Sequence, residues 1–302
     1  MGMIRSVGLV LHPARDCAPV MRLICDWALR REVRVLGLPG EIDRIGENIA
    51  EVPQDELAGR ADLIVSLGGD GTMLRAMRLS SANHTPVLGV NLGKLGFLAE
   101  VDPPDLESAL CAIDEHRFSL EPRSGLRAMV AGQPTLAFND VATIRVPGHP
   151  VCLVQLHVDG HPFVRYGADA VVVATPTGST AYSFSAGGPI VSPSAEGLLV
   201  TPVAPHSAFN RALFLSAGEP LVLEILPGSG DLGVEADGQL TGYLRPGDMM
   251  ELSVLSGAAR VVRLGRTTFY QRARRKLRIA DSAEILPPSL PRPPRQIPNV
   301  TG

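Results

Sequence analysis

The chain has 302 residues, of which 45% are hydrophobic and 20% charged, and its formal net charge is -3. The length is too great for one small core and indicates two domains, while the charge gives no electrostatic basis for binding nucleic acid. No apolar run approaches the ~20 residues of a membrane span, and the opening MGMIRSVGLVLHPAR is more typical of a first strand than of a secretion signal, so we expect a soluble, cytoplasmic protein that binds no membrane.

Short apolar runs and helical patterns alternate through the first 120 residues. Runs rich in Val, Ile and Leu, typical of buried parallel strands, occupy residues 4–11, 33–38, 62–67 and 86–91. Residues 17–31 and 105–113 carry apolar side chains at three- and four-residue spacings, which predicts helices. The alternation predicts an α/β domain with a mostly parallel sheet over residues 1–120.

After Phe118 the pattern changes to alternating runs that glycines and prolines interrupt. The sequence LVQLHVDGHPFVRY predicts a β hairpin that turns at Asp-Gly, and no convincing helical pattern appears. We therefore predict a mainly β domain over residues 121–265. Residues 266–280 are basic and helix-like and are expected to pack back on the first domain, and residues 281–302 are Pro-rich and are expected to form a disordered tail.

The cysteines and histidines do not form a metal-binding pattern. Four cysteines lie in apolar surroundings without a CxxC pair, which favours buried free thiols over disulfides or zinc ligands: Cys17, Cys25, Cys111 and Cys152. The seven histidines show no HxxxH or similar spacing. We therefore expect no metal held permanently by the protein and no permanently bound cofactor.

The motif GGDGT at residues 68–72 lies between a strand-like and a helix-like segment. It is neither a Walker A loop nor a GxGxxG fingerprint. It predicts a turn at the carboxyl end of a strand, where open α/β sheets bind ligands, and its glycines and the nearby Arg75 suit phosphate. The carboxylate of Asp70 would repel phosphate, so it needs another function. We consider a general base for an attacking hydroxyl, a ligand of nucleotide-bound magnesium, and a helix cap.

The segment TPTGSTAYSFSAGGP at residues 175–189 follows the buried-strand pattern AVVVA. Seven of its first eleven residues carry hydroxyls, which suits a pocket for a sugar or nucleobase. The alternative is a polar surface loop, against which the sequence AYSF argues.

Three acidic positions are weaker candidates. The pair Asn139-Asp140 has an amide and a carboxylate that could recognise a base edge and ribose hydroxyls, but Asn-Asp is also common in turns. Asp169 is a weaker candidate still, and Asp237-Gly238 is typical of a hairpin turn.

These motifs together resemble the bacterial NAD kinase family in order and spacing, from about residue 4 to residue 279. The resemblance also includes NLGKLGFLAE at 91–100, GADAVVVATPTGSTAYSFSAGGPI at 167–190, PHSAFNRALFLS at 205–216 and DGQ at 237–239. GGDGT alone also marks lipid kinases and resembles a motif of phosphofructokinases, whereas the long segment after residue 175 is specific. Two alternatives are a GGDGT-type lipid kinase, which would need an acyl channel, and a dinucleotide sensor without activity.

The resemblance implies an activity and a set of site residues. The activity is phosphorylation of the adenosine-ribose 2′-hydroxyl of NAD⁺ by ATP or inorganic polyphosphate, with Mg²⁺ accompanying the donor. The implied fold is an α/β domain plus a mainly β domain with sites between them, in a homotetramer or homodimer. Asp70 would be the proton acceptor, and the phosphates would lie by Gly68, Gly69, Gly71, Thr72 and Arg75. The dinucleotide would be bound by Asn139, Asp140, Gly167, Asp169, Thr177, Thr180, Ala181, Tyr182, Ser183, Phe184, Ser185 and Gln239.

One position departs from the family pattern. The family usually has Asn-Glu where this chain has Asn139-Asp140, so the carboxylate extends one methylene less far. The resemblance therefore leaves open whether the adenosine contacts there are direct, water-bridged or weaker. In the family the counterpart of Asp169 reaches a ligand bound mainly by a neighbouring subunit.

Overall fold

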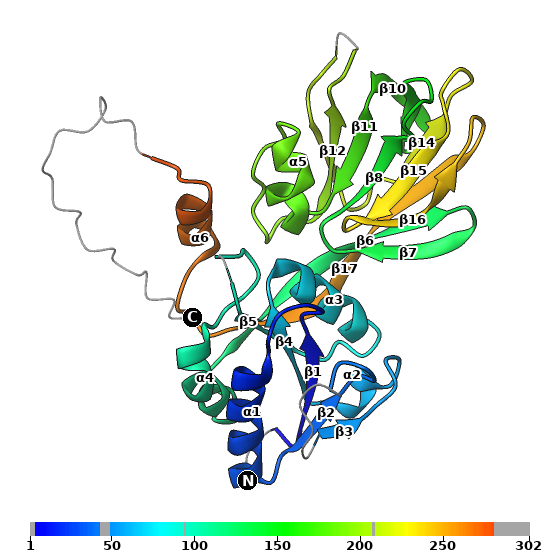
Figure 1. Ribbon diagram of the computed structural model, residues 1–302. Coiled ribbons are helices and arrows are strands. Elements are labelled where there is room, and N and C mark those ends of the chain that lie inside the picture. The colour runs from blue at the N-terminus through cyan, green and yellow to red at the C-terminus, as the bar shows by residue number, and fades with distance from the viewer. Residues whose placement is uncertain (1–3, 43–48, 94, 207–208, 281–302) are drawn as a thin grey trace, which may run out of the picture.

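A computed structural model describes residues 4–42, 49–93, 95–206 and 209–280 (Figure 1). The predicted Pro-rich tail, residues 281–302, lies outside this part of the chain. Within it, no helix has both the length and the apolar character needed to cross a bilayer.

The first part of the chain forms a parallel sheet with helices on both faces. The strands lie in the order β3-β2-β1-β4-β5, with bounds Ser6–Leu11 (β1), Arg34–Gly37 (β2), Ile49–Glu51 (β3), Leu63–Gly68 (β4) and Val87–Asn91 (β5). Helices α1 (Ala18–Arg31) and α4 (Leu106–Asp114) pack on one face, and α2 (Leu57–Arg60) and α3 (Asp70–Ser80) pack on the other. A 3₁₀ turn, Pro103–Asp105 (η1), leads into α4.

The strand order places a switch point next to GGDGT. The chain runs outward in one direction from β1 to β2 and β3, and in the other direction from β4 to β5. Ligands of open α/β sheets bind outside the carboxyl ends of the strands where the order reverses. Here those ends are Leu11 of β1 and Gly68 of β4, so the motif begins at the expected place.

The second part of the chain is a sandwich of two antiparallel layers (Figure 1). One layer contains Ser119–Val130 (β6), Gln133–Ala137 (β7), Cys152–Val158 (β9), His161–Ala168 (β10), Leu221–Ile225 (β14) and Met249–Arg263 (β17). The other has the order β13-β12-β11-β8-β15-β16, with bounds Asp140–Arg145 (β8), Ala170–Ala174 (β11), Gly197–Val203 (β12), Leu213–Ser216 (β13), Leu232–Ala236 (β15) and Gln239–Leu244 (β16). Apolar side chains of both layers form one buried core between them.

Strand β17 joins the two parts into one eleven-stranded sheet. Its first half pairs with β14, and near its end Val261 pairs in parallel with Val87 of β5. Strand β6 runs beside β17 along its length, so both strands extend from the sandwich into the parallel layer. The sheet is therefore continuous across residue 120, where the sequence pattern changes.

The strands and helices predicted for the first 120 residues are confirmed, and their ends differ by a few residues. The structure also contains two short elements that were not predicted, β3 with three residues and α2 with four. The expectation of no helix after Phe118 is wrong, because Thr177–Thr180 (η2) and Tyr182–Ser185 (α5) are helical turns. Four residues are too few to produce a helical period in the sequence. The predicted hairpin is present, and Asp159 and Gly160 have the positive φ angles of 51° and 74° that a tight turn requires.

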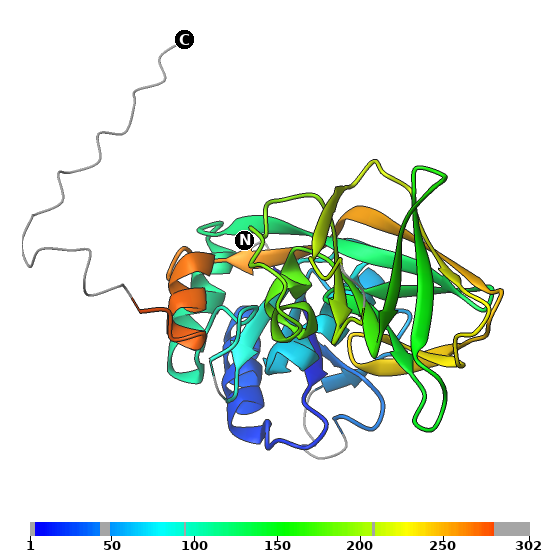
Figure 2. The same ribbon diagram turned by 90° about the horizontal axis from the view of Figure 1, so that it is seen from above.

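Two further features concern the cysteines and the basic segment. All four cysteines are free, but only Cys17 and Cys152 are buried; Cys25 and Cys111 are partly exposed and pack against the margin of the core under α1 and α4. The basic segment forms α6, Phe269–Lys276, which lies beside the parallel layer in both views (Figures 1 and 2).

Candidate active site

Asp70 is the first residue of α3 and is bound to a loop that follows β5. Oδ2 accepts the backbone N–H of Phe97 and Oδ1 accepts that of Leu98, each at 3.0 Å. The loop approaches so closely that a Cβ on Gly96 would lie 2.2 Å from Oδ1, so glycine is required there. The side chain is 26% exposed, and its orientation is fixed while part of it faces solvent. Asp70 therefore does not cap its own helix.

A cavity of about 350 Å³ lies beside GGDGT at the switch point. Its wall includes residues from the ends of β1 and β4, the first two turns of α3 and the β15–β16 hairpin: Leu11, His12, Pro13, Arg15, Gly69, Gly71, Thr72, Leu74, Arg75, Arg78, Asp237 and Gln239. Gly68 leaves room for this turn, because a Cβ on it would lie 2.2 Å from Oγ1 of Thr72. Backbone N–H groups at a helix start and several cationic side chains together suit an anionic ligand.

Two of the three arginines in this wall are held by carboxylates, and the third, Arg15, donates to the carbonyl oxygen of Leu92. Arg75 forms an ion pair with Glu41 and donates to the carbonyl oxygen of Leu11 at 3.1 Å. Arg78, one turn later, pairs with Asp237 at 2.5 Å. Both guanidinium groups are thus oriented at the cavity wall, and Arg75 shares its charge with Glu41.

Asp237 connects this cavity to the pair Asn139-Asp140. Its carboxylate is 1% exposed and accepts the backbone N–H groups of Phe138 at 3.1 Å, Asn139 at 2.6 Å and Asp140 at 3.3 Å. Asp237 and Gly238 have positive φ angles of 48° and 75°, as the hairpin prediction requires. The turn therefore carries a buried carboxylate that positions Asn139 and Asp140 of the candidate dinucleotide site.

The segment that follows β11 packs directly on Asn139. The backbone N–H of Thr175 donates to the carbonyl oxygen of Asn139 at 2.9 Å, and its hydroxyl donates to that of Phe138 at 2.6 Å. A Cβ on Gly178 would lie 1.9 Å from the carbonyl oxygen of Asn139, so only glycine fits. The two motifs, separated in sequence, therefore form one site.

Not all of the predicted hydroxyls face a pocket. Ser183 is completely buried, and its hydroxyl shares a 2.8 Å hydrogen bond with that of Thr201, so this hydroxyl faces the protein interior. Ser179 is also buried, donates to Pro176 and accepts the N–H of Val191. These serines hold the loop in place. The pattern of hydroxyl residues in the sequence does not distinguish side chains that point into the protein from side chains that face a pocket.

The carboxyl of Asp140 lies in an unusual electrostatic environment. Burial raises its pKa to about 7, and the negative charges of Asp237 and Glu235 act in the same direction, while the backbone N–H of Tyr182 opposes them. Burial also raises the pKa of Tyr182, which is close enough to feel Glu235, Asp140 and Asp169. Tyr182 and Asp140 are thus neighbours, as two residues of one ligand site must be.

The remaining candidates surround this centre. Thr177 is buried, while partial or full exposure is found for Thr180, Ala181, Tyr182, Phe184, Ser185 and Gln239. The carbonyl oxygen of Gly167 accepts the N–H of His206 at 2.7 Å. Asp169 is 52% exposed and lies 3.4 Å from the guanidinium of Arg145.

Two models of known protein families match this chain, one in each of its two parts. The family model of the ATP-NAD kinase N-terminal domain matches residues 7–118, and that of the ATP-NAD kinase C-terminal domain matches residues 138–264. The NAD kinase 1 of Streptomyces avermitilis is 37% identical over 92% of this chain and 88% of its own. The chain belongs to the ATP-NAD kinase family. The NAD kinase of Heliobacterium modesticaldum, a further relative, is 39% identical over 90% of this chain and 98% of its own.

Solved structures of the NAD kinase family have the same fold. The yeast NADH kinase complexed with NADH has a TM-score of 0.81 and 26% identity, covering 94% of this chain and 90% of that one. The NAD kinase from Archaeoglobus fulgidus in complex with ATP has a TM-score of 0.71 and 25% identity, covering 90% and 98%. Family membership confirms the resemblance and the two-part fold, and it makes the chain an NAD⁺ kinase rather than a lipid kinase.

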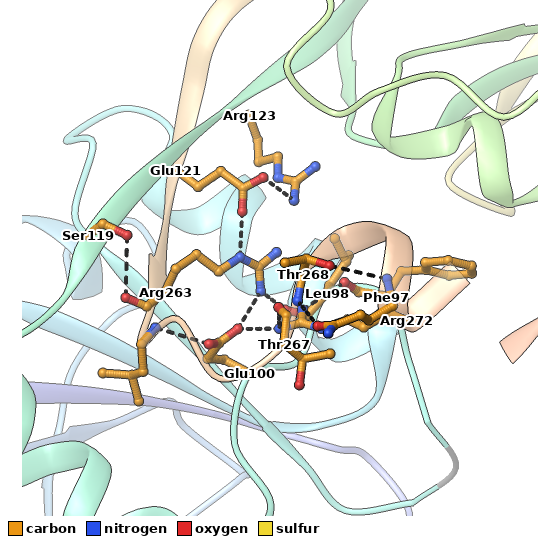
Figure 3. A network of polar contacts seen from close by, with 12 residues as sticks. Phe97, Leu98, Glu100, Ser119, Glu121, Arg123, Arg263, Thr267, Thr268 and Arg272 are labelled. Atoms are coloured by element: carbon orange, nitrogen blue, oxygen red, sulfur yellow. Dashed lines mark hydrogen bonds and ion pairs between the residues drawn. The ribbon is translucent and has the colours of Figure 1, made fainter. Parts of the chain in front are cut away.

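Sequence reasoning missed several polar residues of this NAD kinase fold. A network of charged side chains runs from α6 to the dinucleotide loop (Figure 3): Arg272, Glu100, Arg263, Glu121 and Arg123. Arg123 is buried, its guanidinium lies 3.4 Å from Oγ1 of Thr177, and burial lowers its pKa to about 10. No local sequence signal marks these residues, because each partner comes from a distant segment.

Proposed function

We propose that this NAD⁺ kinase transfers the terminal phosphoryl group of ATP, or of inorganic polyphosphate, to the adenosine-ribose 2′-hydroxyl of NAD⁺. Asp70 accepts the hydroxyl proton. The hydroxyl oxygen forms the new bond to phosphorus while the bond to the leaving phosphate oxygen breaks, so the products are NADP⁺ and ADP, or a polyphosphate shortened by one unit. The Asp70 carboxylate is therefore the acid–base group of the reaction.

The observation that carries the proposal is the place of Asp70 in the GGDGT turn, beside a cavity whose wall adjoins the Asn139 site. Its neighbours Gly69 and Gly71 line the cavity at the switch point, which we assign to the donor phosphates. Arg78 in that cavity pairs with Asp237, which in turn holds the backbone of Asn139. This arrangement supports a donor on one side of Asp70 and a dinucleotide on the other.

The acceptor would lie against Asn139, Asp140 and Tyr182. Tyr182 offers an aromatic face to a nucleobase, and the amide of Asn139 can both donate and accept hydrogen bonds. Because Asp140 accepts the N–H of Tyr182, its shorter side chain holds this loop as well as facing the ligand. This supports a role for Asp140 in shaping the adenosine site.

In this proposal the divalent ion is a companion of the donor phosphates. Within the described residues, no group of three or more His, Cys, Asp or Glu side chains could hold a metal ion. The ion would neutralise the phosphate charge, while the protein supplies N–H groups of the α3 start and the cations Arg15, Arg75 and Arg78. We also propose that the enzyme acts in the cytoplasm as a homodimer or homotetramer, in which the half-exposed Asp169 reaches a neighbouring ligand; light scattering after gel filtration measures the subunit number.

The test is formation of NADP⁺ by the purified protein from NAD⁺, ATP and Mg²⁺, measured with a coupled NADP⁺-specific dehydrogenase. Parallel reactions replace ATP by polyphosphate, or include EDTA. We expect product with at least one donor and none with EDTA. NAD⁺ binding without product from either donor would contradict the proposal and identify a dinucleotide sensor.

A further inference from the structure

Helix α6 brings a cation to Asp70 from the far end of the described chain. Nζ of Lys276 lies 3.1 Å from Oδ2 of Asp70, although 206 residues separate them. The same ammonium lies 4.6 Å from the centre of the Phe97 ring. Lys276 is thus held between a carboxylate and an aromatic face, both of which attract a cation.

The position of Lys276 is fixed by buried contacts one turn earlier. Arg272 of α6 forms a buried ion pair with Glu100 and donates to the carbonyl oxygen of Phe97 at 3.1 Å (Figure 3). Phe269 also packs on Phe97, with ring centres 6.0 Å apart. Phe97 therefore touches the helix through its ring and its carbonyl group, while its N–H binds Asp70.

The contact between Lys276 and Asp70 contributes little to stability. Their side chains are 36% and 26% exposed, and pairs of this kind contribute about 0–1 kcal/mol. The buried Arg272 holds the helix independently of Lys276. An effect of the ammonium on the Asp70 carboxylate therefore explains its placement better than a contribution to stability does.

Among the described residues, the donors to Asp70 leave one lone-pair position of its carboxylate without a partner. An ionised carboxylate has about four lone-pair positions, two on each oxygen. Oδ2 accepts from Phe97 and from Lys276, whereas Oδ1 accepts only from Leu98 among the described residues. The free position is therefore on Oδ1.

We propose that Lys276 is a positioning residue: by occupying the second position on Oδ2 it leaves Oδ1 as the oxygen that accepts the proton of the ribose hydroxyl. This rests on the proposed role of Asp70 as proton acceptor. Loss of the ammonium would leave a second free position, on Oδ2, so that the hydroxyl could bind either oxygen; this lowers the rate of proton transfer without removing either substrate site.

The experiment compares Lys276→Ala, Lys276→Arg and the control Arg275→Ala, which removes an exposed cation from the same turn. We expect Lys276→Ala to lower kcat at least about 10-fold, with KM for NAD⁺ and ATP changed less than about 3-fold. Lys276→Arg should restore most of kcat, added alkylammonium should partly rescue Lys276→Ala, and Arg275→Ala should match wild type.

A double mutant tests whether Lys276 acts through Asp70. In an Asp70→Asn background, Lys276→Ala should lower the residual kcat less than 2-fold, because groups that act as a unit are non-additive. A kcat for Lys276→Ala within 2-fold of wild type would overturn the inference. So would a loss that arginine does not restore and that accompanies a lower Tm. Absence of NADP⁺ formation by the wild type would instead contradict the proposed function.

Discussion

The backbone N–H of Asn139 donates to Oδ1 of Asp237 at 2.6 Å, across 98 residues of sequence. The other oxygen of that buried carboxylate pairs with Arg78 of α3. One side chain thereby joins the helix of GGDGT, the hairpin of the sandwich and the turn of the dinucleotide site.

Removing Arg78 tests this junction. Arg78→Met leaves a buried carboxylate without its cation, and we expect the free energy of unfolding to fall by about 1–3 kcal/mol. Arg60→Met breaks the exposed pair with Glu56 and should cost less than about 0.5 kcal/mol. Urea denaturation measures both values. Equal losses would show that Asp237 does not depend on Arg78.

Asp70→Asn tests the proton acceptor. We expect kcat to fall about 10²–10⁴-fold, the usual contribution of a general base. The amide also directs its NH₂ group toward one of the two loop N–H donors, so stability should fall by about 1–3 kcal/mol. Steady-state kinetics at a temperature where the variant is folded by circular dichroism separates the effects. A variant with wild-type kcat would remove Asp70 from the mechanism.

Tyr182→Ala tests the acceptor site. The ring is partly exposed beside Asp140, so its loss should raise KM for NAD⁺ about 10-fold or more while KM for ATP changes less than about 3-fold. Tyr243→Ala removes an exposed tyrosine of the same sandwich and serves as the control. A selective defect for ATP would mean that the two substrates have been assigned to the wrong sides of Asp70.

The buried carboxyl of Asp140 predicts a dependence of stability on pH. Its folded pKa of about 7 exceeds the ordinary value near 3.9, so between these values the folded state holds a proton that the unfolded state lacks. The stability from this group is full below pH 4 and is lost as pH rises to 7. Asp140→Asn avoids this loss, and its advantage over wild type should grow by about 2–3 kcal/mol from pH 5 to pH 8. Urea denaturation should show no such growth for the exposed Asp55→Asn.

Gly178→Ala tests the contact between the two motifs. The added Cβ would meet the carbonyl oxygen of Asn139, so the loop must move, and KM for NAD⁺ should rise at least about 5-fold with a lower Tm. Gly218→Ala places a methyl group in open space and should leave both values unchanged. Unaltered KM in Gly178→Ala would show that this close approach is not needed for binding.

Local patterns predicted the fold and the GGDGT turn because those features depend on neighbouring residues. Strand β4 is six apolar or small residues, and the apolar face of α3 follows at once, so periodicity identifies both. The continuous apolar runs of the first part and the alternating runs of the second likewise distinguish the two parts. What periodicity could not show is that β17 and β6 continue one sheet across both, since pairing between distant strands leaves no local mark.

The sequence predicted which motifs form the candidate site, but it did not predict the hydrogen bonds that join them. Asp237-Gly238 is a turn, as its sequence indicates, but the turn does not reveal that the carboxylate points inward to Asn139. The hydroxyl of Ser183 bonds Thr201 inside the protein, which the pattern of hydroxyl residues in its motif does not indicate. Lys276 and Arg123 act through partners from distant segments, so only the three-dimensional arrangement reveals them.

The pairing of β17 with β5 has a consequence for synthesis of the chain on the ribosome. Residues of the parallel layer emerge first. Val101 soon pairs with Val90 near the end of β5, but among the described residues the start of β5 at Val87 finds its outer partner in Val261, and Lys276 of α6 reaches Asp70 later still. Until about 260 residues have emerged, the nascent chain carries an unpaired apolar strand edge, which is a site for wrong association. The contact between Lys276 and Asp70 therefore forms only after α6 has been synthesised, and a chain that stops before β17 exposes an edge that chaperones would have to protect.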